Sequence, residues 1–258
     1  MKFDEVKRHV HGVPYINHRN AVKLYDFILQ NDNIRSVLEL GFAHGTASCY
    51  IAAALDEKGE GNLVSVDLVE ARELFKPSIE ELLERTGLGD CVTIHREKTG
   101  YTWFLHNEIK ASTTENVCEP KYDLCIIDGP KNWTIDGAAF FMVDKLLKPD
   151  GWIIFDDYSW SYANADKHGS EATDGIAHRS LSEEEFRTPQ VKEIFQLLVM
   201  QHPSYGNFRI HGEGDWAWAQ KTSDPELRKA TIEYNATYKD GFSRAFAFIN
   251  RVFRIRKL

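Results

Sequence analysis

Residues 36–48 read SVLELGFAHGTAS, and this stretch decides the fold of the chain. Ser36–Leu40 is a short apolar run typical of a buried strand, and Thr46–Leu55 has the composition of a helix. Gly41 and Gly45 stand between them, where the backbone must turn sharply and can approach a ligand closely. The helix that begins here presents free N–H groups and a positive dipole end, so the turn suits an anionic group.

The same alternation of strand and helix continues along the chain. Strands are predicted over 36–40, 63–66, 91–95, 122–127 and 152–155, and helices over 18–30, 46–55, 78–86, 136–147 and 191–200. Continuous apolar strands between helices predict a doubly wound α/β fold, with a parallel sheet covered on both faces. Two further runs, 207–211 and 216–220, flank the turn signal 212–215, so an antiparallel pair ends the sheet.

Composition excludes several classes of protein. The chain has 258 residues, 43% of them hydrophobic, and a net charge of −8, which disfavours a general nucleic-acid or membrane binder. No stretch approaches the roughly 20 apolar residues of a membrane span, and the charged N-terminus lacks the apolar core of a signal peptide. The four cysteines show no metal-type pairing, and Cys49, Cys91 and Cys125 lie in apolar segments, as small core residues do. Free cysteines fit a reducing compartment, so we expect a cytoplasmic protein.

The pattern predicts three parts. Residues 1–34 form a helical segment on the substrate side, 35–223 the main domain, and 224–258 a helical extension that ends on a basic tail. The polar stretch 158–187 interrupts the main domain, and because long loops are often functional, we interpret it as a lid. The terminal helices can lie on the sheet, contact an anionic surface or join subunits in a homo-oligomer.

The turn at Gly41 is followed by a second signal. Glu39, Gly41 and Gly45 form E-x-G-x-x-x-G, which lacks the third glycine of a dinucleotide fingerprint and the Gly-Lys-Ser/Thr of a P-loop. Asp67 ends the next strand, about 20 residues further on, where a carboxylate can grip a ribose diol. A helix cap is the structural alternative for Asp67.

These residues resemble the class I S-adenosylmethionine (SAM)-dependent methyltransferases over about 35–221. The resemblance implies a Rossmann-like, seven-stranded sheet of order 3-2-1-4-5-7-6, with the last strand antiparallel and SAM at the switch point between strands 1 and 4. The SAM contacts it implies are Glu39, Gly41, Phe42, Ala43, His44, Gly45, Thr46, Ser48, Asp67, Leu68, Asp128, Gly129 and Trp133. Glu39 can order the loop or bind the amino group of SAM, and Trp133 can stack on the adenine edge or pack in the core.

Acidic residues end two neighbouring strands. Asp128 follows the strand 122–127, and Asp156 and Asp157 follow 152–155. Because the carboxyl ends of adjacent parallel strands meet at one edge, these carboxylates should converge and repel one another unless they are protonated or bridged by a cation. A hard divalent ion such as Mg²⁺ suits oxygen ligands, although turn or cap roles are the alternative for each acid.

The arrangement is similar to that of metal-dependent O-methyltransferases of the catechol type and of the type that methylates natural-product sugars. In both, an acid after strand 4 and a pair after strand 5 hold the metal, here Asp128, Asp156 and Asp157. The base lies three positions after the strand-4 acid, which implies Lys131, as in the catechol type. The sugar-methylating type usually has histidine there, so the identities of the base and of the substrate stay open. Lys131 can act as a base only if its pKa falls.

Histidines in the predicted lid are further candidates. His168 and His178 lie within 158–187 and can serve as a general base or a metal ligand, although solvated loop histidines are more common. His11 and Tyr15, near the N-terminus, can border the substrate mouth.

Three functions compete on the sequence alone. The first is metal-dependent O-methylation of a small molecule or saccharide. The second is metal-independent N- or O-methylation by proximity, and the third is a non-catalytic methyltransferase fold that binds a partner. The third function is disfavoured because the residues that suit SAM are all present, namely Glu39, Gly41, Gly45 and Asp67. Nucleic-acid methylation is also disfavoured, because no Asn/Asp-Pro-Pro-Tyr signature follows strand 4.

Overall fold

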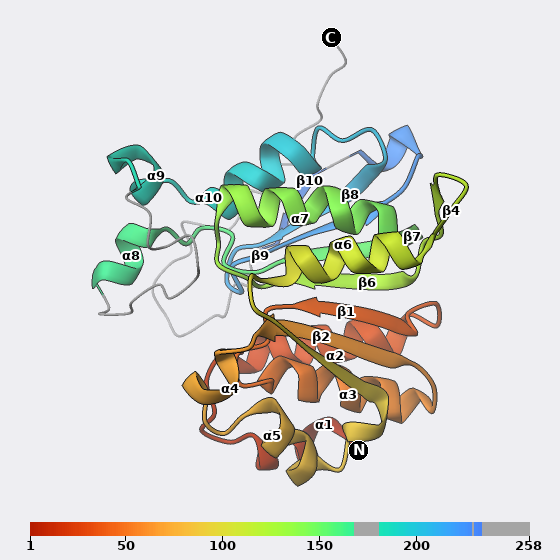
Figure 1. The fold of residues 1–258 in the computed structure, drawn as a ribbon, viewed down its shortest axis with the longest axis vertical. Helices are drawn as coiled ribbons and strands as arrows, with labels where there is room; N and C mark the ends of the chain where they lie inside the picture. The colour runs from red at the N-terminus through yellow and green to blue at the C-terminus, as the bar shows by residue number, and fades with distance from the viewer. Residues whose placement is uncertain (168–180, 229, 234–258) are drawn as a thin grey trace, which may run out of the picture.

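An eight-stranded sheet forms the centre of the protein, in a computed structural model that describes residues 1–167, 181–228 and 230–233 (Figure 1). Its strand order is β10-β8-β9-β7-β6-β1-β2-β3. The strands are β1 (Ser36–Leu40), β2 (Asn62–Leu68), β3 (Val92–Glu97), β6 (Tyr122–Ile127), β7 (Leu147–Phe155), β8 (Tyr205–His211), β9 (Trp216–Lys221) and β10 (Ala230–Glu233). A separate hairpin joins β4 (Thr113–Thr114) to β5 (Val117–Cys118).

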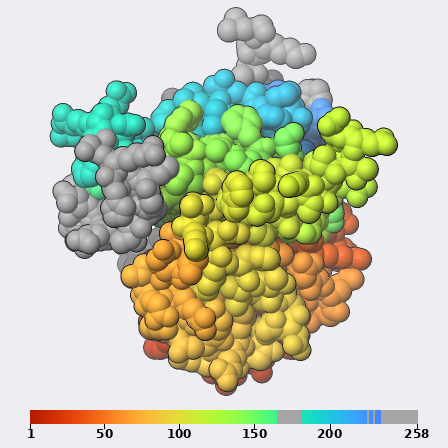
Figure 2. All heavy atoms as spheres, in the orientation of Figure 1, coloured from red at the N-terminus to blue at the C-terminus, as the bar shows by residue number. Residues whose placement is uncertain are grey.

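Helices cover both faces of the sheet. They are α1 (Phe3–His9), α2 (His18–Gln30), α3 (Thr46–Lys58), α4 (Ala71–Leu74), α5 (Ile79–Thr86), α6 (Tyr101–Ala111), α7 (Trp133–Leu146), α8 (Tyr162–Lys167), α9 (Glu183–Arg187) and α10 (Gln190–Glu193), with the short 3-10 turns η1 (Gly89–Cys91) and η3 (Pro225–Leu227) and the π-helical turn η2 (Ile194–Val199). In Figure 2, α6 and α7, coloured yellow to green, lie across the middle of the visible face. None of the described helices is long and apolar enough to cross a membrane.

Two hydrophobic cores result from the alternation of side chains along the strands. Val37 and Leu38 are adjacent in β1 and both fully buried, yet they belong to different cores. Val37 joins the core formed with α1, α2, α3 and α5, whereas Leu38 joins the one formed with α6, α7 and η2. Successive strand residues point to opposite faces, so apolar runs such as β1 fill both layers.

The predicted topology is confirmed, with one addition. The seven predicted strands correspond in chain order to β1, β2, β3, β6, β7, β8 and β9, and they lie in the predicted order 3-2-1-4-5-7-6. The last of them, β9, is antiparallel to β7 and to β8. The sheet has eight strands rather than seven because β10 pairs with the outer edge of β8 in parallel.

The region after Pro225 differs from its prediction. A helical extension was expected from 224 onward, whereas the described residues there form η3 and the strand β10. Thr231 and Ile232 are β-branched, which favours a strand, and the unpaired edge of β8 supplies hydrogen-bond partners. The basic tail within 234–258 lies outside the described residues. Within the predicted lid, the described parts include the helices α8 and α9.

Candidate active site

The turn between β1 and α3 lies against the end of β6. Gly41 and Gly45 have φ angles of +88° and +84°, which favour glycine. The Gly41 N–H donates to the Val66 carbonyl at 2.8 Å. A Cβ at Gly41 would lie 2.2 Å from the backbone oxygen of Asp128, so only glycine allows this approach. The predicted cofactor turn therefore lies against the backbone of Asp128, the first of the three predicted metal ligands.

Glu39 is buried beneath this turn. Its Oε2 atom accepts hydrogen bonds from the hydroxyls of Ser48, at 2.5 Å, and Ser65, at 2.6 Å. Burial raises the pKa of Glu39 to about 7, although both serine hydrogen bonds oppose the shift and the charges of Asp128 and Asp67 add to it. Glu39 thus connects α3 to β2 through hydrogen bonds, as expected if its role is to order the loop. A contact between Glu39 and a ligand stays a prediction.

Asp67 binds the backbone of the same turn. Its Oδ2 atom accepts from the N–H groups of Phe42, at 2.9 Å, and Ala43, at 2.8 Å, while Oδ1 accepts from the N–H of Leu68 at 2.7 Å. The carboxylate therefore holds the tip of the turn near the end of β2. A ribose would meet a carboxylate already fixed in place, and its binding there stays a prediction.

The N-terminal segment packs over the beginning of α3. The Thr46 hydroxyl donates to the Pro14 carbonyl at 2.9 Å. His44 is buried, and its Nδ1 lies 2.8 Å from the Pro77 carbonyl, so this nitrogen carries the proton. The exposed ring of Tyr15 lies 5.2 Å from that of His44. These contacts place His44 and Tyr15 beside the predicted cofactor turn.

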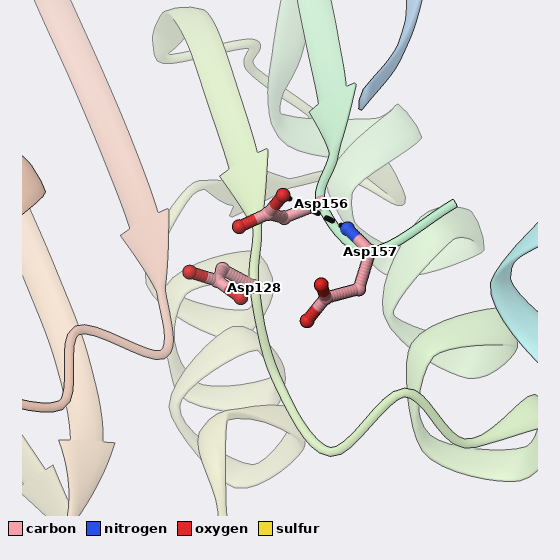
Figure 3. A group of neighbouring side chains, drawn as sticks. All are labelled: Asp128, Asp156 and Asp157. Carbon is pink, nitrogen blue, oxygen red and sulfur yellow. Dashed lines mark hydrogen bonds between the residues drawn. The ribbon is translucent and has the colours of Figure 1, made fainter. Parts of the chain in front are cut away.

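The three predicted metal ligands do converge. Asp128 follows β6, and Asp156 and Asp157 follow β7; each offers one carboxylate oxygen, and these three atoms lie within 4.8 Å of one another (Figure 3). Parallel pairing of β6 with β7 aligns the strand ends, and the Asp157 N–H donates to Asp156 Oδ1 at 2.8 Å. Among the described residues, this is the one group of three acidic, histidine or cysteine side chains with such geometry.

The cluster disfavours negative charge. Burial raises the pKa of Asp128 to about 6; the Lys131 ammonium opposes this shift and the Asp157 charge adds to it. Burial also raises the pKa of Asp156 well above its usual range, with further contributions from Asp128 and Asp157. A cation between these oxygens would offset the cost of ionising Asp128 and Asp156.

Lys131 supplies one such cation. Its Nζ forms a short ion pair with Asp128 Oδ1 and lies 3.3 Å from Asp157 Oδ2. Burial would lower the pKa of Lys131, but the charges of Asp128, Asp157 and Asp156 outweigh it and raise the pKa. The fall in pKa that a base role of Lys131 requires is therefore not found in the cluster formed by these side chains alone. Lys131 can accept a proton only after this pairing is weakened.

Aromatic residues beyond the cluster divide into buried and accessible ones. Trp133 is 41% exposed, which excludes the core-packing alternative. Its backbone N–H donates to Gln190 Oε1 at 2.7 Å. Tyr158 is buried, whereas Trp160 is partly exposed and lies 5.0 Å from the ring of Tyr162. Stacking of Trp133 on adenine stays a prediction.

Sequence reasoning did not identify the side chains that hold the turn after β6. Tyr101, Asn132, Asp136, Tyr162 and Gln190 all bind this turn or its supports and are all buried. Only Asn132 carried a local signal, as an N-cap residue before a helix. The candidate bases His168 and His178 lie outside the described residues.

The comparisons with known proteins agree with this geometry. Residues 38–158 match a family model described as a methyltransferase domain, Methyltransf_24. No curated protein matches the chain at a significant level. An O-methyltransferase from Bacillus cereus, solved in complex with SAH, is 17% identical with a TM-score of 0.58, over 86% of this chain and 92% of its own. The O-methyltransferase TomG from Streptomyces achromogenes, solved with SAM, is 16% identical with a TM-score of 0.55, over 85% and 89%.

At these identities the two structures establish the fold alone, and the family match adds a similarity to a methyltransferase domain over slightly less than half of the chain. The matched residues run from β1 to Tyr158, just beyond the acids that follow β7, so they contain the glycine turn and the whole acid cluster. The chain therefore has the fold of these O-methyltransferases, and its residues 38–158 are similar to a methyltransferase domain.

Proposed function

We propose that this enzyme methylates a hydroxyl oxygen of a small molecule or a saccharide, with SAM as the donor and a divalent cation, preferably Mg²⁺, as the second cofactor. The observation that carries the proposal is the convergence of Asp128, Asp156 and Asp157 beside the turn that contains Gly41. Two proteins of similar fold are themselves named O-methyltransferases, which supports the choice of oxygen as the acceptor atom.

The donor set suits a hard cation. All three candidate ligands are carboxylates, and each can contribute an oxygen within the 4.8 Å separation. The raised pKa values of Asp128 and Asp156 mean that their ionisation is costly, which supports a bound cation in the proposal. Lys131 provides a single charge against three carboxylates, so room for further neutralisation remains.

The chemistry requires a nucleophilic oxygen in line with the S–CH₃ bond. A divalent cation, when bound, lowers the pKa of a coordinated hydroxyl. Lys131 is placed by its ion pairs at the edge of the same acids. A cation bound to these acids would weaken the pairing, so that the ammonium could lose a proton to solvent and the neutral amine could then take the hydroxyl proton. The close packing of Gly41 on Asp128 fixes the position of the cofactor turn relative to the acid cluster. This fixed position favours the alignment that methyl transfer needs.

The cofactor is proposed to lie along the glycine turn. The carboxylate of SAM would meet the beginning of α3, and the ribose would meet Asp67. The remaining contacts are proposed for residues on this turn and at the ends of β2 and β6, namely Glu39, Gly41, Phe42, Ala43, His44, Gly45, Thr46, Ser48, Leu68, Asp128, Gly129 and Trp133. The Ser48 hydroxyl already donates to Glu39, so this hydroxyl is not a free donor for the ligand.

A second candidate is methylation without a metal. It is favoured by Lys131, whose ammonium already pairs with two of the three acids. In that case, the lysine would orient the acceptor by charge and hydrogen bonding, and proximity to SAM would supply most of the rate.

Transfer of radiolabel from SAM to a panel of phenols and saccharides, with EDTA present or absent, separates the two candidates. We expect labelled ether products whose formation falls by about a hundredfold in EDTA and returns with Mg²⁺. Asp156→Ala should resemble the EDTA-treated enzyme. Asp123→Asn is the control, since Asp123 pairs with Lys148 at the opposite end of β6. Transfer that resists EDTA and tolerates Asp156→Ala would select the metal-independent reaction.

A further inference from the structure

The turn between β6 and α7 holds Lys131 in an unusual backbone conformation. Lys131 has a φ angle of +61°, in the left-handed region that favours glycine. Such a conformation persists only where the surroundings enforce it. The side chain is 13% exposed and points its Nζ at Asp128 and Asp157. The position of the ammonium therefore depends on the groups that fix this turn.

The α7 side of the turn is fixed by a buried network. Asn132 Oδ1 accepts from the N–H of Thr134 at 2.9 Å and so caps α7. Asp136 Oδ2 accepts from the Asn132 N–H at 2.7 Å, and the Tyr101 hydroxyl donates to Asp136 Oδ1. This network holds the residue after Lys131.

The β6 side is held by a residue from a different part of the chain. The hydroxyl of Tyr162, on α8, donates to the Pro130 carbonyl at 2.9 Å, and Tyr162 is 4% exposed. Its ring packs against that of Trp160, and the backbone N–H of Trp160 donates to the Asp157 carbonyl at 3.1 Å. The segment that follows the β7 acids thus bonds to the residue before Lys131 and to one of the acids that Lys131 pairs with.

We propose that Tyr162 is a positioning residue for Lys131. By holding the Pro130 carbonyl, it keeps the Lys131 ammonium against Asp128 and Asp157, so that the placement of the lysine depends on the segment that begins after Asp157. The role of Lys131 in catalysis rests on the proposed function, whereas the mechanical link between Tyr162 and Lys131 does not. A change in the 158–167 segment on acceptor binding would be transmitted to the lysine through the hydrogen bond from Tyr162 to Pro130.

The link is tested by hydrogen exchange in Tyr162→Phe. Loss of the hydroxyl should speed amide exchange in the peptide 128–135 by about tenfold, because the Pro130 end of the turn is released. Tyr122→Phe is the matched control: Tyr122 is equally buried and its hydroxyl donates to Glu108 at 2.8 Å, at the other end of β6. Unchanged exchange of 128–135 in Tyr162→Phe, or an equal rise in Tyr122→Phe, would overturn the proposal.

A second measurement reports on the position of the Lys131 ammonium. It compares the affinity of the variants for Mn²⁺, which serves as a paramagnetic probe. The Lys131 ammonium competes with cations for Asp128, so Lys131→Met should bind Mn²⁺ about tenfold more tightly and Tyr162→Phe several-fold more tightly. If Tyr162 acts through Lys131, the double variant should match Lys131→Met alone. Additive effects would contradict the proposal. Absence of Mn²⁺ binding in every form would refute the proposed metal site, and the exchange result would still decide the role of Tyr162.

Discussion

Replacement of Lys131 by alanine is expected to lower the rate of methyl transfer by about a hundredfold or more, the usual contribution of a positioned base. SAM affinity should stay nearly unchanged, because Lys131 contacts the acids and not the glycine turn. The measurement is turnover with saturating SAM, together with calorimetric binding of SAM to the variant. A loss in turnover alone would place the lysine in the chemical step.

Lys148→Ala is the matched control for this variant. Lys148 pairs with Asp123 at 2.9 Å, so it is also a lysine bound to an aspartate of β6, but at the far end of the strand. It should retain most of the activity. If Lys131→Ala also retained most of the activity, the base would have to be sought in water or in His168 and His178.

Replacement of Gly41 by alanine should abolish tight SAM binding. The added Cβ would lie 2.2 Å from the Asp128 carbonyl oxygen, and the φ angle of +88° is unfavourable for any residue with a Cβ. The turn and the end of β6 must then move apart, which displaces both the cofactor groups and the acid. We expect the Kd for SAM, measured by calorimetry, to rise by about a hundredfold or more.

Gly59→Ala separates this steric effect from backbone strain. Gly59 ends α3 with a φ angle of +75°, and a Cβ there meets nothing within 4 Å. The variant should lose about 1 kcal/mol of stability from the left-handed conformation. Its SAM affinity should equal that of the wild type. Equal losses of affinity in the two variants would show that the contact between Gly41 and Asp128 has no special role.

Most of the sheet could be predicted because its strands carry a local signal. The range Ser36–Leu40 was predicted as observed, since an apolar run that ends at Gly41 has few alternatives. The helix α6 was missed. Its buried residues Tyr101, Phe104 and Leu105 are interleaved with the exposed Trp103, which obscures the apolar face. The strand β10 was missed because it depends on its pairing with β8, which no local pattern in the sequence specifies.

The residue types of the site were also predictable, but their interactions were not. The positions of Asp128 and Asp156 after adjacent strands were enough to predict their convergence. The raised pKa of Lys131 follows from the approach of its Nζ to two carboxylates, which no spacing along the chain specifies. Tyr162 lies 32 positions from Pro130 in the sequence, so its hydrogen bond exists only in the folded chain.

Titration of Mg²⁺ into the protein saturated with SAH, followed by calorimetry, tests whether the acid cluster binds a metal beside the cofactor. We predict one molecule of SAH and one Mg²⁺ bound per chain, with the Mg²⁺ heat lost in Asp156→Ala and SAH binding retained. Failure of the wild type to bind SAH would contradict the cofactor site. Binding of SAH without any binding of Mg²⁺ would contradict the metal site and leave Lys131 as the cation of the acid cluster.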